Sequence, residues 1–264
     1  MKVATVSLNQ VWEDKKANIN LCENYIKVAS DKATDIIIFP EMTLTGFSPC
    51  NILLSESIIN SQTLKQFSNL AKKYNINIIF GAYLQEEVNN LFYNMLCIAH
   101  KDGSIHPVYS KTHLFSHSNE DKFISPGGRI VTRKLGDMVF GFAICYDLRF
   151  PELFSIMSGK CDVIVIIANW PSSRNHHWHV LLRARAIENE CIVFGVNRTG
   201  VDGNKIKYSE SSVMITPDGC VEKACFSFSD LNIYKIKKIQ VEKYRKNLPT
   251  IKNKRFSLYK QYWD

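Results

Sequence analysis

The chain has 264 residues, of which 45% are hydrophobic and 22% are charged, with 12 glycines and 8 prolines. A chain of this length can fold around a large core without disulfides or metals, and this composition excludes disordered and fibrous proteins. The net charge of +8 is concentrated near the carboxyl terminus, where residues 235–260 hold ten Lys or Arg side chains against the single Glu242.

Hydrophobic patterning predicts strands and helices that alternate along the chain. In the first half we expect helices at residues 15–30 and 63–74 and strands at residues 3–8, 35–39, 76–82 and 91–99. In the second half we expect helices from Pro151 and at 178–189, and strands at 138–144, 163–168, 191–196, 212–215 and 221–226. Continuous apolar runs such as Ile-Ile-Ile-Phe at 36–39 indicate strands covered on both faces. The alternation predicts a single α/β domain with helices covering a sheet.

The basic segment carries apolar side chains between its charges, including Tyr244, Leu248 and Ile251. These side chains can anchor it to the body of the protein or to a partner subunit, with the charges in solvent. Binding of nucleic acid or an anionic surface is the alternative. We favour docking, because a run of charges alone provides no side chains that recognise bases. We therefore expect a main domain over residues 1–234, a docked basic tail over 235–264, and no nucleic-acid partner.

The eight cysteines form no Cys-x-x-Cys pair, and several lie in apolar runs where a reduced thiol packs as a small hydrophobe. The amino terminus lacks the continuous apolar stretch of a signal peptide, and no window approaches eighteen consecutive apolar residues. We therefore expect a soluble, cytoplasmic protein with no membrane partner.

Three reactive side chains follow apolar runs, at the strand ends where ligands gather in α/β sheets. Glu41 follows the run at 36–39, Cys145 follows the strand expected at 138–144, and Lys111 ends a short apolar stretch. Each alone is a weak signal, since buried cysteines are mostly inert and charged side chains mostly solvated. Together they form a complete set for acyl transfer, because a thiol needs a base and a nearby cation stabilises an oxyanion.

Other motifs exclude several enzyme classes. The cluster His176, His177 and His179, and the pair His113 and His117, lack a Glu or Cys at a recognisable metal-site spacing, so we expect no metal. The sequence also lacks the GxSxG, GxxxxGK[ST] and GxGxxG patterns. Serine hydrolase, P-loop and Rossmann functions are therefore not supported.

The segments around the three reactive side chains resemble signature blocks of the nitrilase superfamily of carbon–nitrogen hydrolases. These blocks are Phe-Pro-Glu at 39–41, Ser-Lys-Thr-His-Leu-Phe at 110–115 and Cys-Tyr-Asp-Leu-Arg-Phe-Pro-Glu at 145–152. The likeness extends through Ala-Asn-Trp-Pro at 168–171, His-Trp at 177–178 and Arg-Ala-Ile-Glu-Asn at 185–189. The blocks are similar to the omega-amidase branch, its bacterial members in particular, and the resemblance covers about residues 2–223.

This resemblance implies an α-β-β-α sandwich that pairs into a homodimer with an α-β-β-α-α-β-β-α core, and it implies no metal and no organic cofactor. By position, Glu41 would be the general base, Lys111 the cation that stabilises the oxyanion, and Cys145 the nucleophile. The backbone N–H of Tyr146 would be a second oxyanion donor. A second glutamate often follows the lysine in this family, and Glu120 is the matching candidate, although it could also be a solvated loop acid.

The resemblance also implies a substrate class. Omega-amidases act on small dicarboxylic acid monoamides such as 2-oxoglutaramate or succinamate, so the pocket needs a cation for the distal carboxylate. Arg149 and Arg174 are the candidates, because a guanidinium can bind a carboxylate through two parallel hydrogen bonds. An internal ion pair of Arg149 with Glu152 or Asp147 is an equally consistent interpretation.

Our leading hypothesis is a cysteine amidohydrolase that releases ammonia from such a monoamide through a thioester intermediate, in a pocket walled by Trp170 and Phe47 unless these belong to the core. The alternatives are another amidase or carbamoylase of the superfamily, for example one acting on deaminated glutathione, and a non-enzymatic binding protein on the same fold. A third class is a thiol redox sensor in which Cys161 or Cys191 resolves an oxidised Cys145.

Overall fold

The computed structural model describes residues 1–262, and within them the strands form two large sheets and one small one. The first sheet has eight strands, with β3 (Glu56–Ser57) beside β4. Its other strands follow the spatial order β14 (Phe226–Phe228), β15 (Leu231–Lys235), β1 (Lys2–Val6), β2 (Ile36–Ile38), β4 (Asn77–Glu86), β5 (Leu91–Ala99) and β6 (Ile105–Ser110).

The second sheet has five strands and faces the first. Its strands follow the order β13 (Val213–Ile215), β10 (Ile192–Asn197), β9 (Val163–Ala168), β8 (Met138–Ile144) and β7 (Thr132–Leu135). The three central strands are parallel, so their carboxyl ends lie at one edge. A small hairpin of β11 (Gly200–Val201) and β12 (Lys207–Tyr208) lies beyond that edge of β10.

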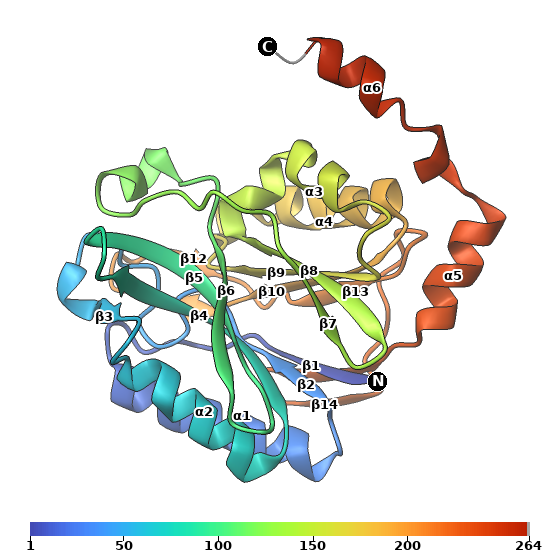
Figure 1. Cartoon of the computed structure of the whole chain (residues 1–264). Helices are drawn as coiled ribbons and strands as arrows, with labels where there is room; N and C mark the ends of the chain where they lie inside the picture. Colours follow the sequence, from blue (N-terminus) through green and yellow to red (C-terminus); the bar gives the residue numbers. More distant parts are fainter. Residues whose placement is uncertain (263–264) are drawn as a thin grey trace.

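Helices cover the outer faces of both large sheets (Figure 1). The first sheet is covered by α1 (Lys15–Asp31) and α2 (Gln62–Tyr74), and the second by α3 (Pro151–Met157) and α4 (Asn175–Asn189). The inner faces pack against each other through β-branched and aromatic side chains such as Ile38, Ile79, Phe142 and Val165. The expected α-β-β-α sandwich is therefore confirmed, and most of its strands lie where the apolar runs predicted them.

One expected strand was wrong, and one expected helix is longer than predicted. The strand expected at residues 221–226 is mostly loop, since Val221 forms only an isolated bridge with Ile215 and β14 begins at Phe226. The helix expected at 178–189 begins three residues earlier, at Asn175. Six strands were not predicted, namely β3, β6, β7, β11, β12 and β15. Of these, β15 joins the first sheet by pairing antiparallel with β1, far away in the sequence.

The basic segment runs over α5 (Lys238–Asn247) and α6 (Phe256–Tyr259). Arg245 donates hydrogen bonds to the carbonyl oxygens of Cys161 (2.6 Å) and Glu190 (3.0 Å). The Ile251 N–H donates to the Glu190 carboxylate at 3.0 Å. Residues 245–251 therefore contact the second-sheet half, whereas α6 extends away from it (Figure 1). The last two residues of the expected tail, 263 and 264, lie outside the described residues.

No helix in residues 1–262 combines the length and the apolar character that crossing a bilayer requires.

Candidate active site

Glu41 lies just beyond the end of β2, fully buried between the two sheets. The turn that carries it lies against β4 at Gly81, where a Cβ atom would come within 2.3 Å of the Met42 nitrogen. Only glycine permits this approach. The Gly81 N–H also donates to Thr43 Oγ1 at 3.0 Å. The first sheet therefore fixes the backbone of Glu41 tightly.

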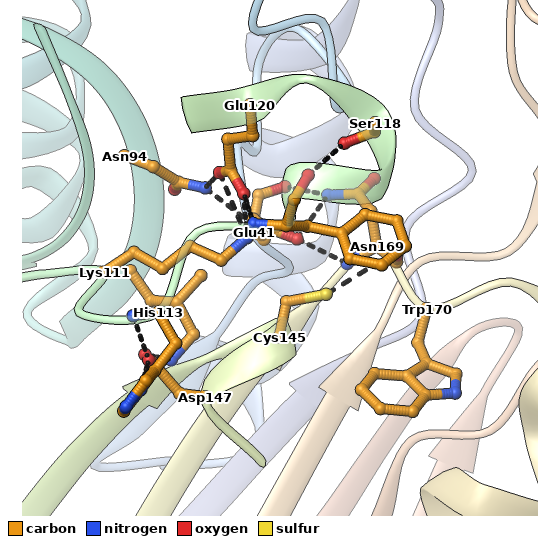
Figure 2. A network of polar contacts seen from close by, with 12 residues as sticks. Glu41, Asn94, Lys111, His113, Ser118, Glu120, Cys145, Asp147, Asn169 and Trp170 are labelled. Carbon is orange, nitrogen blue, oxygen red and sulfur yellow. Dashed lines mark hydrogen bonds and ion pairs between the residues drawn. The ribbon is translucent and has the colours of Figure 1, made fainter. Parts of the chain in front are cut away.

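Lys111 follows β6, and its ammonium group is fully buried between two carboxylates (Figure 2). Its Nζ lies 2.9 Å from Glu41 Oε1, and 3.1 Å and 2.9 Å from Glu120 Oε1 and Oε2. The Glu120 Oε2 atom also accepts the Phe115 N–H at 2.7 Å. Glu120 has no solvent exposure, whereas its neighbour Asp121 is exposed, so the alternative that Glu120 is a solvated loop acid is wrong.

Cys145 follows β8 and begins a 3₁₀ turn over Cys145–Arg149. Its φ of 48° lies in the left-handed region, which costs a side-chain-bearing residue roughly 1–3 kcal/mol and persists only where neighbours enforce it. Asp147 holds this conformation of the turn in place by hydrogen bonds. Its Oδ2 accepts the Ile144 N–H (2.9 Å) and the Tyr109 hydroxyl (2.7 Å), and its Oδ1 accepts the His113 N–H (2.8 Å). One carboxylate therefore ties the turn of Cys145 to the segment that carries Lys111.

Asn169 follows β9 and links Glu41 to Cys145. Its backbone N–H donates to Glu41 Oε2 at 2.8 Å, and its Nδ2 donates to the Glu41 carbonyl oxygen at 2.7 Å. Its own carbonyl oxygen accepts the Cys145 thiol at 3.9 Å. Asn169 is a strand-end polar residue like Glu41 and Cys145, so the rule that found those two applies to it as well. The structure thus brings Glu41, Lys111, Glu120 and Cys145 together at one place (Figure 2).

The charges of this group set the ionisation of the thiol. Burial raises the pKa of Cys145 well above its usual value, and the Glu41 carboxylate raises it further, while Lys111 opposes the rise. Burial alone would lower the pKa of Lys111, but the Glu120 and Glu41 carboxylates outweigh it and raise that pKa. Lys111 therefore stays charged between the two carboxylates. Because its pKa is raised, the resting form of Cys145 is the thiol.

A cavity of about 160 Å³ opens onto Cys145, Lys111 and Asn169. Aromatic side chains form much of its wall, among them Phe47, Phe115, Tyr146, Trp170 and Tyr208. Trp170 is only 3% exposed, so it belongs both to the core beside Trp178 and to the cavity wall.

Arg149 and Arg174 both line this cavity. The Arg149 guanidinium packs 4.8 Å above the ring of Trp170, and its Nη2 lies 3.4 Å from His177 Nδ1. Within residues 1–262 neither arginine forms an ion pair, and the pairing of Arg149 with Asp147 or Glu152 is not observed. Two cationic groups therefore face the cavity with no carboxylate partner from the described chain.

The two cysteines considered as redox partners of Cys145 lie at the opposite end of the second sheet from it. Cys161 and Cys191 precede β9 and β10, whereas Cys145 lies at the carboxyl end of β8, beside the end of β9. A six-residue strand spans roughly 17–20 Å. Neither thiol can form a disulfide with Cys145 without unfolding the sheet.

Comparisons with known proteins point to one family. The model of the carbon–nitrogen hydrolase family matches residues 2–246. The chain is 33% identical to a Staphylococcus aureus protein called hydrolase in agr operon, over 98% of this chain and 100% of that protein. It is 35% identical to the 2-oxoglutaramate amidase of Bacillus subtilis, over 77% of this chain and 78% of that enzyme. It is 32% identical to the omega-amidase YafV of Escherichia coli K12, over 83% of this chain and 82% of that enzyme.

Among solved structures, the fold matches XC1258 of Xanthomonas campestris, a CN-hydrolase superfamily protein with an arsenic adduct in its active site. The TM-score is 0.89 and the sequence identity is 28%, over 96% of this chain and 97% of that one.

The electrostatics of the site can be tested by alkylation of Cys145 with iodoacetamide as a function of pH. Because the thiolate is the reactive form, we expect the rate to keep rising above pH 9 in the unmodified protein. Glu41→Gln removes the nearest negative charge, so the midpoint should fall by about one pH unit or more. The exposed Asp121→Asn is the matched control and should leave the midpoint in place.

The rate must be measured by mass spectrometry of the peptide that contains Cys145, because Cys50, Cys220 and Cys225 are exposed and will react too. An unchanged midpoint in Glu41→Gln would show that Glu41 does not control the thiol.

Proposed function

Because this chain belongs to the carbon–nitrogen hydrolase family, we propose that it is an omega-amidase, which hydrolyses a small dicarboxylic acid monoamide to the dicarboxylate and ammonia. The observation that carries the proposal is one cavity lined by Cys145, by Lys111, whose Nζ lies 2.9 Å from Glu41 Oε1, and by two arginines that have no carboxylate partner in the described chain. The names of the Bacillus subtilis and Escherichia coli relatives support 2-oxoglutaramate and similar monoamides as substrates.

The first step is attack of the Cys145 sulfur on the amide carbon. The raised pKa of the thiol means that its proton leaves during the attack, and Glu41 is the base that takes it. This transfer leaves the net charge of the buried group unchanged, so no new buried charge is created. Negative charge then grows on the carbonyl oxygen, where Lys111 and the backbone N–H of Tyr146 stabilise it. Loss of one such donor costs about 3–4 kcal/mol of transition-state stabilisation.

The second step breaks the carbon–nitrogen bond. Glu41 returns its proton to the nitrogen, because an amide anion is too basic to leave unaided, and ammonia departs. The acyl group remains on Cys145 as a thioester. Glu41 then takes a proton from water, the hydroxyl adds to the thioester carbon, and Cys145 leaves as its proton is restored. One amide and one water thus yield one carboxylic acid and one ammonia.

Glu120 supports this chemistry through Lys111. Lys111 has a carboxylate on each side, and the bidentate contact with Glu120 fixes its ammonium group beside Cys145. Without Glu120 the buried cation would have one partner left, a change that typically destabilises a buried pair by 3–5 kcal/mol.

The cavity supports a small anionic substrate. Its volume of about 160 Å³ is below the roughly 300 Å³ at which pockets for drug-sized ligands begin. Arg149 and Arg174 have no carboxylate partner in the described chain, so a substrate carboxylate can bind them without breaking an existing ion pair. This combination favours a monoamide of four or five carbons over a larger amide such as deaminated glutathione.

We further propose a cytoplasmic homodimer that uses the outer face of α3 and α4 together with the tail. Ile156 of α3 is 42% exposed, and Val180 and Ile187 of α4 are each 49% exposed. Val180 and Ile187 lie seven residues apart and so share one helix face. In the tail, Phe256 is 48% exposed beyond the contacts that hold α5. An apolar surface made of these elements fits a second copy of the chain.

The substrate assignment can be tested by measuring ammonia release from a panel of amides, carbamoyl compounds and nitriles. We expect release from 2-oxoglutaramate and succinamate, and none from either in Cys145→Ala. Arg149→Gln and Arg174→Gln should each lower kcat/KM for succinamate by about 10- to 100-fold, the size expected for a hydrogen bond between charged groups. Butyramide has no carboxylate, so the unmodified enzyme, Arg149→Gln and Arg174→Gln should hydrolyse it equally well.

Arg133, which is exposed on β7, provides the matched control, and Arg133→Gln should behave as the unmodified enzyme. Absence of ammonia from both monoamides would refute the omega-amidase function, and release from a carbamoyl compound or deaminated glutathione instead would select the corresponding alternative.

The dimer can be tested by size-exclusion chromatography with light scattering. We expect a dimer for the unmodified chain and a monomer for the double variant Val180→Glu, Ile187→Glu, because buried unpaired charges are costly. Val88→Glu, at a position that is 95% exposed in the turn between β4 and β5, should remain dimeric. A monomeric unmodified chain would contradict the proposal.

A further inference from the structure

Asn94 is a fully buried amide on β5, and no pattern in the sequence marks it as functional. Its Nδ2 donates to Glu41 Oε1 at 2.7 Å and to Glu120 Oε1 at 3.1 Å (Figure 2). Its backbone carbonyl accepts the Lys111 N–H at 2.9 Å. A primary amide nitrogen has only two hydrogens, so the side chain uses both of them to join the two carboxylates that contact Lys111.

Packing does not explain an amide at this position. Within residues 1–262 the Asn94 Oδ1 atom is buried and has no hydrogen-bond partner. An unpaired buried oxygen lowers the free energy of unfolding, whereas an apolar side chain of similar shape would not carry that cost. The two N–H groups that face Glu41 and Glu120 are therefore the feature that the amide adds.

The neutral charge of Asn94 suits its surroundings. The charged and titratable groups that face Glu41 are Lys111, Glu120 and Cys145. A cation in place of Asn94 would add a second buried positive charge beside Lys111, whereas a neutral donor bonds to both carboxylates and leaves the total charge unchanged.

The donors of Asn94 also distinguish the two oxygens of Glu41. Oε1 accepts from both Asn94 and Lys111. Oε2 accepts the Asn169 backbone N–H at 2.8 Å, with the Asn169 amide farther away at 3.5 Å. Each oxygen thus accepts two contacts, but the second contact of Oε2 is long, so Oε2 can take a proton with the smaller loss. Its donor Asn169 also accepts from the Cys145 thiol.

We propose that Asn94 is a positioning residue: it holds Glu41 so that Oε2 receives the Cys145 proton, and it holds Glu120 against Lys111. This inference rests on the proposed function, because it assigns the proton transfer to Glu41. Asn94 does not line the cavity, so it acts through the two carboxylates and makes no contact with substrate.

The test compares Asn94→Ala with Asn189→Ala. Asn189 is the matched control because it is also fully buried, its Nδ2 also donates two hydrogen bonds (2.8 and 3.3 Å), and its Oδ1 is also unpaired, but it lies at the end of α4. For Asn94→Ala we expect kcat for succinamate to fall about 10- to 100-fold, the range for lost hydrogen bonds to charged groups. KM should stay the same.

The pH profile separates positioning from a general structural effect. Loss of the two donors makes protonation of the carboxylates easier, so the acidic limb of kcat/KM should move to higher pH by about one unit in Asn94→Ala. In Asn189→Ala the limb should not move. If Asn94→Ala loses activity only in proportion to its stability, with the acidic limb in place, the proposal is overturned. Asn94→Leu keeps the approximate side-chain shape, removes both donors without adding a charge, and serves as the second variant should Asn94→Ala not fold.

A stability measurement distinguishes failure of this inference from failure of the proposed function. If the unmodified chain hydrolyses none of the amides, the proposed function fails. The role of Asn94 is then read from a double-mutant cycle on the free energy of unfolding, with Asn94→Ala and Glu41→Gln. Because Asn94 donates to Glu41 Oε1 at 2.7 Å, the effects of the two changes should not add. Additive effects would contradict the inference.

Discussion

A buried ammonium group between two buried carboxylates is the constraint on which the rest of the site depends. Each ion loses its hydration at a cost of several kcal/mol, and only close pairing with additional hydrogen bonds repays that cost. Burial of any one of Glu41, Lys111 and Glu120 is therefore favourable only when its partners are buried beside it. Because they come from the end of β2, the end of β6 and a 3₁₀ turn, their pairing fixes three separate segments relative to one another.

The same group determines how Cys145 reacts. Burial, and then the Glu41 carboxylate, hold the pKa of the thiol high, so the resting enzyme carries a thiol rather than a thiolate. In the proposed mechanism such a cysteine is protected from indiscriminate reaction and becomes nucleophilic only as Glu41 accepts its proton. The second sheet contributes Cys145, the first sheet contributes Glu41 and Lys111, and Asp147 keeps the two halves in register.

Much of this arrangement is predictable from the sequence, because continuous apolar runs reveal buried strands and reactive residues gather at strand ends. That rule finds Glu41, Lys111 and Cys145, and it also applies to Asn169. It cannot find Asn94, which lies within a strand and meets partners 53 and 26 residues away. Nor can local patterns place β15 beside β1, because that pairing joins the two ends of the domain. Whether Arg149 pairs internally likewise depends on Asp147, whose oxygens are occupied by Tyr109, His113 and Ile144.

The central claim is that Cys145 carries the acyl group during turnover. The most direct measurement is a mass spectrum of enzyme quenched with acid while it hydrolyses succinamate, followed by peptide mapping. Our account predicts a mass increase equal to one succinyl group, confined to the peptide that contains Cys145 and lost on treatment with hydroxylamine. Steady ammonia release with no adduct on Cys145, or with the adduct on another cysteine such as Cys50, would contradict it.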